Sequence, residues 1–294
     1  MTVKTEQPVP VNGASSGLHT YKDAPTKTIE VGGTSFSYRE LGPSGQVPVV
    51  FLTHLAAVLD NWDPRVVDGI AAKHRVIAFD NRGVGASGGS TPKTIEEMAT
   101  DAVAFIRALG LDQVDLFGFS MGGMIAQVIA QEEPQLVRKM IIAGTGPAGG
   151  EGIDKVTRIS YLDTARGLLT RHDPKEFLFF TRTPNGRGAA KDFLARLEER
   201  TNDRDKDISV RSFRAQLKAI HRWGKQEPAD LSRIHQPVLV ANGESDKMVP
   251  SKNTVDLDRR LPNSQLIMYP DAGHGGVFQF NEDFVKRALE FLRS

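Results

Sequence analysis

The G-x-S-x-G sequence at residues 118–122 constrains the fold of this chain more than any other feature. Residues 113–117 form a β-type run before it, and residues 124–130 form a helix-type run after it. A strand, a sharp turn and a helix in this order make a nucleophile elbow, in which the serine sits on strained backbone. Side chains two positions before and after the serine would collide in such a turn, so glycine is needed there. The pattern therefore predicts Ser120 as a nucleophile projecting above a β-sheet.

A candidate acid and a candidate base follow the serine in the chain. Residues 237–241 read as a short buried strand that leads into a turn-rich loop with Asp246. Residues 265–269 read as another strand, and His274 lies in the loop after it. Open α/β sheets place their functional sites at the carboxyl ends of strands. We therefore expect Ser120, Asp246 and His274 to meet at one edge of the sheet.

Two alternatives for the acid stay open. An aspartate in a loop rich in glycine and serine is often a turn residue, which is the other reading of Asp246. Asp271 is a rival, although it is too close to His274 in sequence to come from a different strand end. Residues 144–147, after the preceding strand, offer no carboxylate.

Four segments resemble the α/β-hydrolases of the esterase, lactonase and cofactor-free haloperoxidase group. They are the elbow at 118–123, the acid loop at 243–250, the histidine loop at 272–275, and the D-x-R-G-x-G-x-S sequence at 80–87. The resemblance runs from about residue 29 to the C-terminus. It implies an α/β fold with a mostly parallel eight-stranded sheet, helices on both faces, and a helical cap inserted after the sixth strand.

The chain divides into three parts on this interpretation. Residues 1–26 are rich in Pro, Gly, Ser and Thr and are expected to form a flexible N-terminal arm. Residues 27–144 and 234–294 alternate strand and helix patterns and form the core. Residues 145–233 break this rhythm and form the helical cap. The expected strands are residues 28–31, 35–39, 49–53, 75–79, 114–119, 139–143, 237–241 and 265–269, with helices at 95–109 and 123–131.

The loop after residues 49–53 departs from the pattern of the resembled family. Leu55 stands after His54 where glycine is usual. A backbone N–H donates whatever its side chain, so the resemblance implies an oxyanion hole made by the N–H groups of Leu55 and Met121. The Leu55 side chain should shape the acyl side of the pocket, and His54 should hold the loop through hydrogen bonds.

Most aromatic residues of the cap should pack between helices, and one or two should contact the substrate. We expect His54, Trp62, Phe213 and Trp223 to contribute substrate contacts.

Composition excludes several classes of protein. The 37 Lys and Arg residues balance 36 Asp and Glu residues, and no basic stripe indicates a nucleic-acid partner. No apolar run approaches the roughly 18 residues of a membrane span. Because the chain has no cysteine, disulfides and cysteine-based metal sites are excluded, and a cytoplasmic location is expected. No metal and no cofactor are expected, and a homodimer is left open.

The residues together predict a serine hydrolase that acts on a small-molecule ester or lactone through an acyl-enzyme. A nucleophilic aspartate would indicate a dehalogenase or an epoxide hydrolase, and Ser120 argues against both. Other readings stay open: a perhydrolase of the haloperoxidase type, a carbon–carbon bond hydrolase, and a non-catalytic ligand receptor on the same fold.

Overall fold

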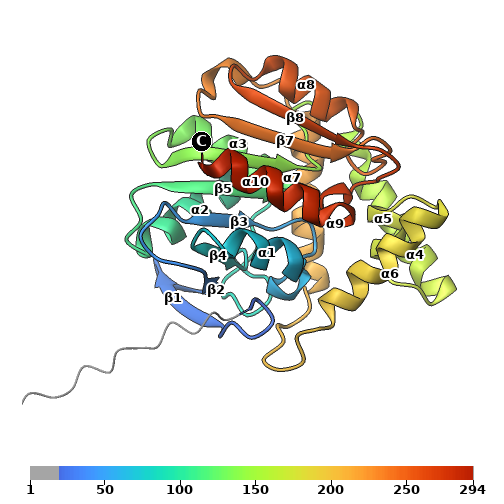
Figure 1. Cartoon of the computed structure of the whole chain (residues 1–294), viewed down its shortest axis with the longest axis horizontal. Helices are drawn as coiled ribbons and strands as arrows, with labels where there is room; N and C mark the ends of the chain where they lie inside the picture. Colours follow the sequence, from blue (N-terminus) through green and yellow to red (C-terminus); the bar gives the residue numbers. More distant parts are fainter. Residues whose placement is uncertain (1–19, 294) are drawn as a thin grey trace, which may run out of the picture.

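The computed structural model describes residues 20–293, which form a twisted sheet covered by helices on both faces (Figure 1). The sheet has eight strands in the order β1-β2-β4-β3-β5-β6-β7-β8. Strand β2 is antiparallel to both of its neighbours, and β3 to β8 are parallel. The eight-stranded, mostly parallel sheet predicted from the sequence is confirmed. The strands are β1 (Lys27–Val31), β2 (Thr34–Leu41), β3 (Val49–Leu52), β4 (Val76–Phe79), β5 (Val114–Phe119), β6 (Val137–Ala143), β7 (Val238–Gly243) and β8 (Ser264–Tyr269).

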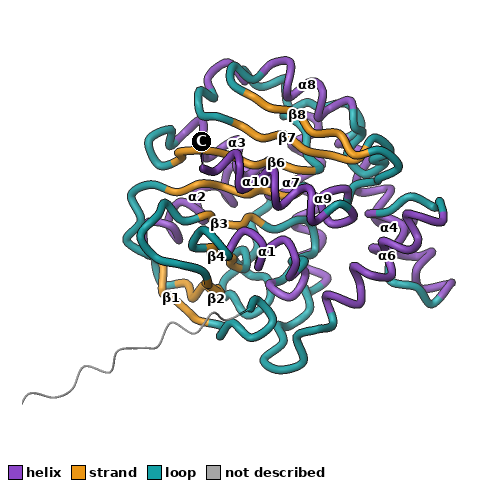
Figure 2. Tube along the Cα trace, in the orientation of Figure 1, coloured by secondary structure: helices purple, strands orange, loops and turns teal. Residues whose placement is uncertain are grey.

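Two layers of helices enclose the sheet (Figure 2). Helices α1 (Pro64–Ala71), α9 (Gly276–Gln279) and α10 (Asn281–Arg293) pack on one face. Helices α2 (Ile95–Ala108), α3 (Met121–Glu132) and α8 (Lys252–Arg260) pack on the other. Within residues 20–293, no helix combines the length and the apolar character that a bilayer span requires.

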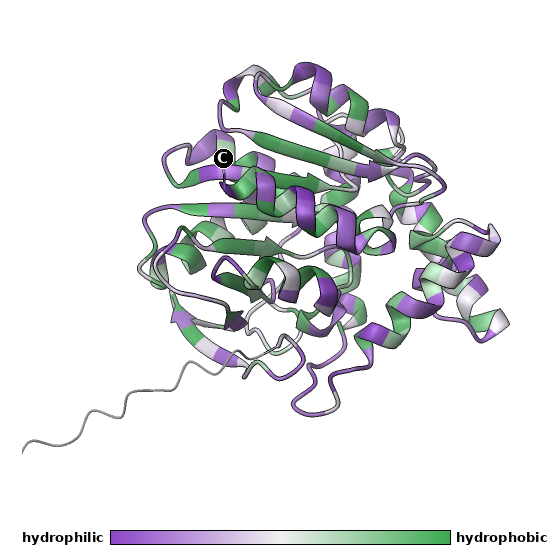
Figure 3. Cartoon of the chain, in the orientation of Figure 1, coloured by the Kyte–Doolittle hydropathy of each residue, from purple (hydrophilic) through white to green (hydrophobic). Residues whose placement is uncertain are grey.

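The central strands are apolar because helices cover both of their faces. Every residue of β3, β4 and β5 is buried, and their sequences are VVFL, VIAF and VDLFGF. A strand with only one buried face would alternate apolar and polar residues, whereas doubly covered parallel strands read as continuous apolar runs. Figure 3 shows this contrast between the apolar sheet and the mixed surfaces of the outer helices.

Between β6 and β7 the chain forms four α-helices, two short 3-10 helices at Ile153–Lys155 and Leu231–Arg233, and no strand. The α-helices are α4 (Val156–Thr170), α5 (Pro174–Phe179), α6 (Pro184–Leu197) and α7 (Val210–Lys225). We call residues 153–225 the helical insertion. In Figure 1, α4, α5 and α6 project to one side of the sheet. Helix α7 lies closer in, where Ile220 and Trp223 join the core that α2 and α3 also form.

Buried ion pairs tie the helical insertion to the core. Asp60 follows β3 and binds the Arg39 guanidinium at 2.6 Å, with both side chains almost fully buried. The same carboxylate accepts a hydrogen bond from the backbone N–H of Asp205 at 2.7 Å, just before α7. On α6, Arg196 pairs with Asp63 at 2.7 Å. Removing one partner of such a buried pair leaves an uncompensated charge, so these contacts fix where the insertion sits.

The carboxyl groups of Asp80 and Asp205 face each other near these ion pairs. Asp80 follows β4, is fully buried, and accepts a hydrogen bond from the Leu59 N–H at 2.9 Å through Oδ1. Its Oδ2 and the Oδ2 of Asp205 converge where a side chain on Gly85 would stand. Burial, and then the neighbouring Asp205 carboxyl, raise the pKa of Asp80 well above its ordinary value. Two facing carboxyl oxygens of this kind are compatible only if they share a proton.

The expected flexible arm does not extend to residue 26. Its residues 1–19 lie outside the described residues. Tyr21 is buried, donates its hydroxyl to the Leu59 carbonyl at 2.7 Å, and donates its N–H to Asp68 at 2.6 Å. Arg200 of the insertion donates to the Ala24 carbonyl at 2.9 Å. Composition alone did not reveal these anchors, because they depend on partners far away in sequence.

Candidate functional site

Ser120 occupies the sharp turn between β5 and α3. Its φ of 56° and ψ of −116° are strained for a residue with a side chain. A side chain at position 118 would collide with the Gly122 carbonyl, and one at position 122 would collide with the Leu52 carbonyl. The predicted strand, turn and helix are therefore present, although the helix begins at Met121 rather than at residue 123. This turn places the serine hydroxyl at the carboxyl edge of the sheet.

His274 and Asp246 are directly paired. His274 Nδ1 lies 2.7 Å from Asp246 Oδ2, and both side chains are buried. Asp246 also accepts hydrogen bonds from the Asn242 side chain at 3.1 Å and from the N–H groups of Met248 and Val249 at 2.8 and 3.1 Å. Four donors thus hold the carboxylate in one orientation. Because Nδ1 is engaged, Nε2 is the ring nitrogen that His274 has available for other chemistry.

The rival acid, Asp271, has a different set of partners. Its carboxylate accepts hydrogen bonds from the hydroxyls of Thr183 and Thr181 at 2.9 and 3.0 Å and from Asn185 at 3.3 Å. These bonds, the one from Thr183 above all, lower the pKa of Asp271. Asp271 therefore holds the start of α6, and Asp246 is the carboxylate that contacts His274.

A cavity of about 340 Å³ opens beside these residues. Ser120 and His274 both line it, as do residues of α4, α5 and α7. The volume falls within the range of about 300–1,000 Å³ that is usual for small-molecule sites. The nucleophile and the base predicted from the sequence thus share one cavity that the helical insertion helps to build.

Two of the four expected substrate contacts line this cavity, namely His54 and Phe213. Trp62 does not. It is buried in the core cluster that includes the apolar residues of α1, and its ring lies 4.9 Å from the ring of Phe51 and edge-on to it. Trp223 also lies elsewhere, buried among core residues with its Nε1 donating to the Gly146 carbonyl at 3.2 Å. Aromatic character and helical position did not separate Phe213 from Trp223, because the direction of each side chain depends on how α7 docks.

The loop after β3 makes a tight turn at residues 54–57. Ala57 N–H donates to the His54 carbonyl at 3.2 Å, and Ala56 lies in the left-handed region with a φ of 64°. The Leu55 side chain lines the cavity, as expected. Across residues 20–293, the N–H groups of Leu55 and Met121 have no hydrogen-bond partner. Both are therefore free to donate to a ligand.

Gln216 from α7 holds this loop from the other side. Its Oε1 accepts a hydrogen bond from the Ala56 N–H at 2.8 Å, and its side chain is fully buried. Gln216 was not among the site residues predicted from the sequence. A signal was present, because Gln216 lies on the same helical face as Phe213 and Ile220, where an apolar residue is expected.

His54 acts on the same loop as a neutral ring. Its Nδ1 lies 2.9 Å from the Leu55 carbonyl, which can only accept, so Nδ1 carries the proton. The ring stands edge-on to Phe119 and Phe179 at 5.4 and 5.2 Å. Burial lowers the pKa of His54 to about 3. His54 therefore stays uncharged near neutral pH and supports the loop.

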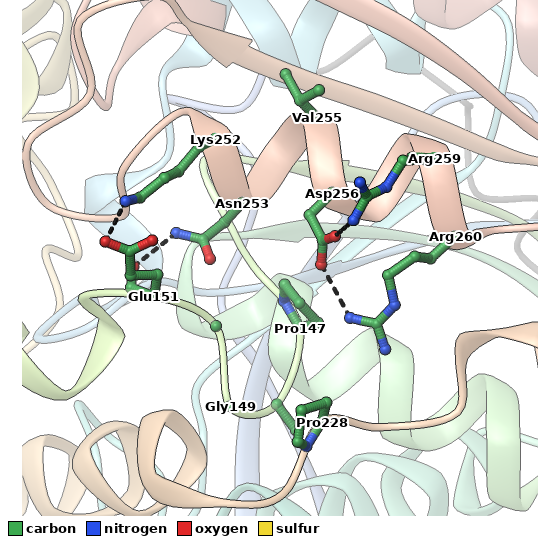
Figure 4. Close-up of a pocket in the computed structure, with 12 residues that line it drawn as sticks. Pro147, Gly149, Glu151, Pro228, Lys252, Asn253, Val255, Asp256, Arg259 and Arg260 are labelled. Carbon is green, nitrogen blue, oxygen red and sulfur yellow. Dashed lines mark hydrogen bonds and ion pairs between the residues drawn. The ribbon is translucent and has the colours of Figure 1, made fainter.

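A second hollow, of about 560 Å³, lies between residues 147–151 and α8 (Figure 4). Its charged side chains pair with one another: Lys252 with Glu151, and both Arg259 and Arg260 with Asp256. Neither Ser120 nor His274 lines it. The smaller cavity is therefore the candidate functional site.

Comparison with known proteins agrees with the fold. A family model described as "alpha/beta hydrolase fold" matches residues 47–280. An α/β-hydrolase fold protein from Chitinophaga pinensis is similar in structure, with a TM-score of 0.89 and 40% identity, covering 94% of this chain and 100% of that one. A Mycobacterium tuberculosis protein provisionally named a non-heme bromoperoxidase is 27% identical, over 84% of this chain and 94% of its own. A non-heme chloroperoxidase of Streptomyces lividans is 26% identical, over 89% and 97% respectively. The chain belongs to the α/β-hydrolase fold family.

Proposed function

We propose that this protein hydrolyses a carboxylic ester or lactone, with Ser120 as nucleophile, His274 as general base and Asp246 as the orienting acid. One observation carries the proposal. His274 Nδ1 contacts Asp246 Oδ2 at 2.7 Å, and the same histidine lines a cavity with a serine held on strained backbone. A nucleophile, a base and a group that orients the base are the parts that covalent acyl transfer requires.

The reaction follows from these parts. His274 accepts the Ser120 proton at Nε2 while the serine oxygen attacks the acyl carbon. Asp246 keeps the other proton on Nδ1 and stabilises the imidazolium that forms. The N–H groups of Leu55 and Met121 donate to the oxyanion of the tetrahedral intermediate. His274 then protonates the departing alkoxide and activates the water that cleaves the acyl-enzyme.

A fluorophosphonate probe and a panel of p-nitrophenyl esters and lactones test this proposal. We expect the wild type to be labelled at Ser120 and to turn over at least one member of the panel. Ser120→Ala should abolish labelling and reduce turnover by several orders of magnitude, because removal of a triad serine has that effect. Ser264→Ala is the matched control. Ser264 begins β8, donates its hydroxyl to the Asp258 carboxylate on α8, and does not line the cavity. Labelling that persists in Ser120→Ala would assign the nucleophile elsewhere.

Perhydrolysis is a second candidate, favoured by the relatives that carry peroxidase names. Hydrogen peroxide would replace water in attacking the acyl-enzyme, releasing a peracid and free Ser120, and the peracid would oxidise bromide. Bromination of monochlorodimedone in acetate, peroxide and bromide measures this activity. A rate that Ser120→Ala leaves unchanged would exclude the acyl-enzyme route.

A further inference from the structure

The cavity beside Ser120 has an apolar wall and a polar wall. Leu55, Phe179, Phe213 and Met248 contribute apolar surface around the nucleophile. The polar wall comes from the helical insertion, with Ser160 and Thr164 on α4 and Asp173 and Lys175 at the start of α5. Ser160 and Thr164 are four residues apart on one helix, so they lie on the same face, one turn from each other.

The Ser160 hydroxyl lacks the hydrogen bond that a serine inside a helix usually makes. A helical serine or threonine normally donates to the carbonyl four residues earlier. Thr170 does so on the same helix, bonding the Arg166 carbonyl at 2.8 Å, and Thr100 does so on α2, bonding the Glu96 carbonyl at 3.0 Å. Ser160 is 2% exposed, and its Oγ has no hydrogen-bond partner within residues 20–293. A buried hydroxyl without a partner is unfavourable, so it is retained most readily where a ligand supplies the partner.

The charge of the polar wall limits what that ligand group can be. Lys175 Nζ lies 3.3 Å from Asp173 Oδ2. These are the one ammonium and the one carboxylate among the residues lining the cavity, so their charges compensate each other. The wall therefore presents no net charge. It suits a neutral oxygen, such as a hydroxyl or a keto group, better than a carboxylate.

We propose that Ser160 is a specificity-determining residue that hydrogen-bonds a neutral hydroxyl or keto oxygen carried by the substrate in addition to its scissile carbonyl. The proposal deepens the hydrolase function proposed above and rests on it. A site built to hydrogen-bond a polar group discriminates strongly against an analogue without that group, because its own polar atom is then left unpaired. The substrate class is thus an ester or lactone that carries a further hydroxyl or keto oxygen, on its acyl or its alcohol side, rather than a plain alkyl alkanoate.

Two pairs of esters distinguish which side of the substrate carries this oxygen. The first pair is p-nitrophenyl 3-hydroxybutyrate and p-nitrophenyl butyrate, which differ on the acyl side. The second pair is 2-hydroxyethyl butyrate and propyl butyrate, which differ on the alcohol side. For each pair, the ratio of kcat/KM for the oxygen-bearing ester to that of the plain ester is measured in the wild type and the variants.

We expect the ratio to exceed one in at least one pair and to fall about tenfold or more in Ser160→Ala, with activity on the plain ester retained. Ser160→Thr keeps the hydroxyl and should keep most of the ratio. Thr157→Val is the matched control, because Thr157 lies on the same helix with a buried, unpartnered hydroxyl but does not line the cavity. It should leave both ratios unchanged.

The outcomes separate the two proposals. If the wild type hydrolyses the plain esters but Ser160→Ala changes neither ratio by more than about twofold, the Ser160 assignment is overturned and the hydrolase function stands. An equal change in Thr157→Val would also overturn it, by showing a general effect of α4. If the wild type hydrolyses no ester and the fluorophosphonate does not label Ser120, both proposals are wrong.

Discussion

Replacing Gln216 with methionine tests whether the helical insertion controls the oxyanion loop. Methionine is unbranched and similar in length, but it lacks the acceptor that Gln216 offers. The lost bond is the 2.8 Å contact from the Ala56 N–H, and Gln216 is fully buried, so water does not easily take its place. A buried N–H left without a partner costs about 1–3 kcal/mol.

The size of the catalytic effect follows from the backbone of Ala56. Its φ of 64° is left-handed, which costs a residue other than glycine about 1–3 kcal/mol. Because this strain matches the strength of the lost bond, Ala56 can relax in the variant and carry the Leu55 N–H out of position. A loss of 1–3 kcal/mol corresponds to about 5–150-fold, and removal of a whole oxyanion donor costs about 10²–10³-fold. We expect kcat to fall about 10–100-fold in Gln216→Met, with KM little changed.

Steady-state kinetics on p-nitrophenyl butyrate and the affinity for a boronic acid measure this effect. The boronate forms a tetrahedral adduct with the serine, so its affinity should fall in parallel with kcat. Gln216→Glu keeps an acceptor and should retain more activity. Gln236→Met is the matched control, because Gln236 is buried and bonds the Pro134 carbonyl away from the cavity. The reasoning fails if Gln216→Met stays within about threefold of the wild type, or if both methionine variants lose activity in proportion to thermal stability.

Three further changes test other parts of the site and the fold. Asp246→Asn should keep the fold and lower kcat by about 10⁴-fold, the effect of the same change in a serine protease, whereas Asp271→Asn should cost far less; the reverse order would reassign the acid. The raised pKa of Asp80 means that its contribution to stability is present at low pH and is lost as the pH rises through that pKa. Asp80→Asn should therefore reduce the loss of Tm between pH 5 and pH 9, by about 1–2 °C for each kcal/mol recovered, and an unchanged pH profile would contradict the carboxyl pair with Asp205. Phe213→Ala should change kcat/KM unequally along a series of acyl lengths, because Phe213 lines the cavity; an equal loss for all substrates would make it a packing residue only.

The sequence predicted the sheet and the sharp turn at Ser120 because both depend on local patterns. Fully buried parallel strands appear as apolar runs, and all eight expected strands occur in the structure. The elbow was readable because its backbone tolerates only glycine at 118 and 122, which restricts the sequence itself. Ser120, Asp246 and His274 each follow a predicted strand, so their position at one edge of the sheet could also be predicted. These features need no knowledge of how distant segments pack.

Other elements could not be predicted in the same way. The short helix α1 was missed, although Asp63 followed by Pro64 is a typical start signal, because its apolar pattern spans only eight residues. The choice between Asp246 and Asp271 required the position of α6, because the hydroxyls of Thr181 and Thr183 donate hydrogen bonds to the Asp271 carboxylate. Both cases show a local signal whose meaning depends on a partner far away in the chain.

The substrate cavity depends almost wholly on such distant partners. Of its lining residues, Ser120 follows β5 and His274 lies in the loop after β8, whereas Ser160 and Thr164 lie on α4 and Lys175 lies on α5. Trp223 and Phe213 illustrate the consequence, because they lie ten residues apart on α7 and only Phe213 reaches the cavity. A rotation of α7 about its axis would move Phe213 relative to the cavity and would also move Gln216 away from Ala56. The position of one helix thus sets both the shape of the substrate site and the support of the oxyanion loop, so we expect substitutions that shift α7 to change specificity and kcat together.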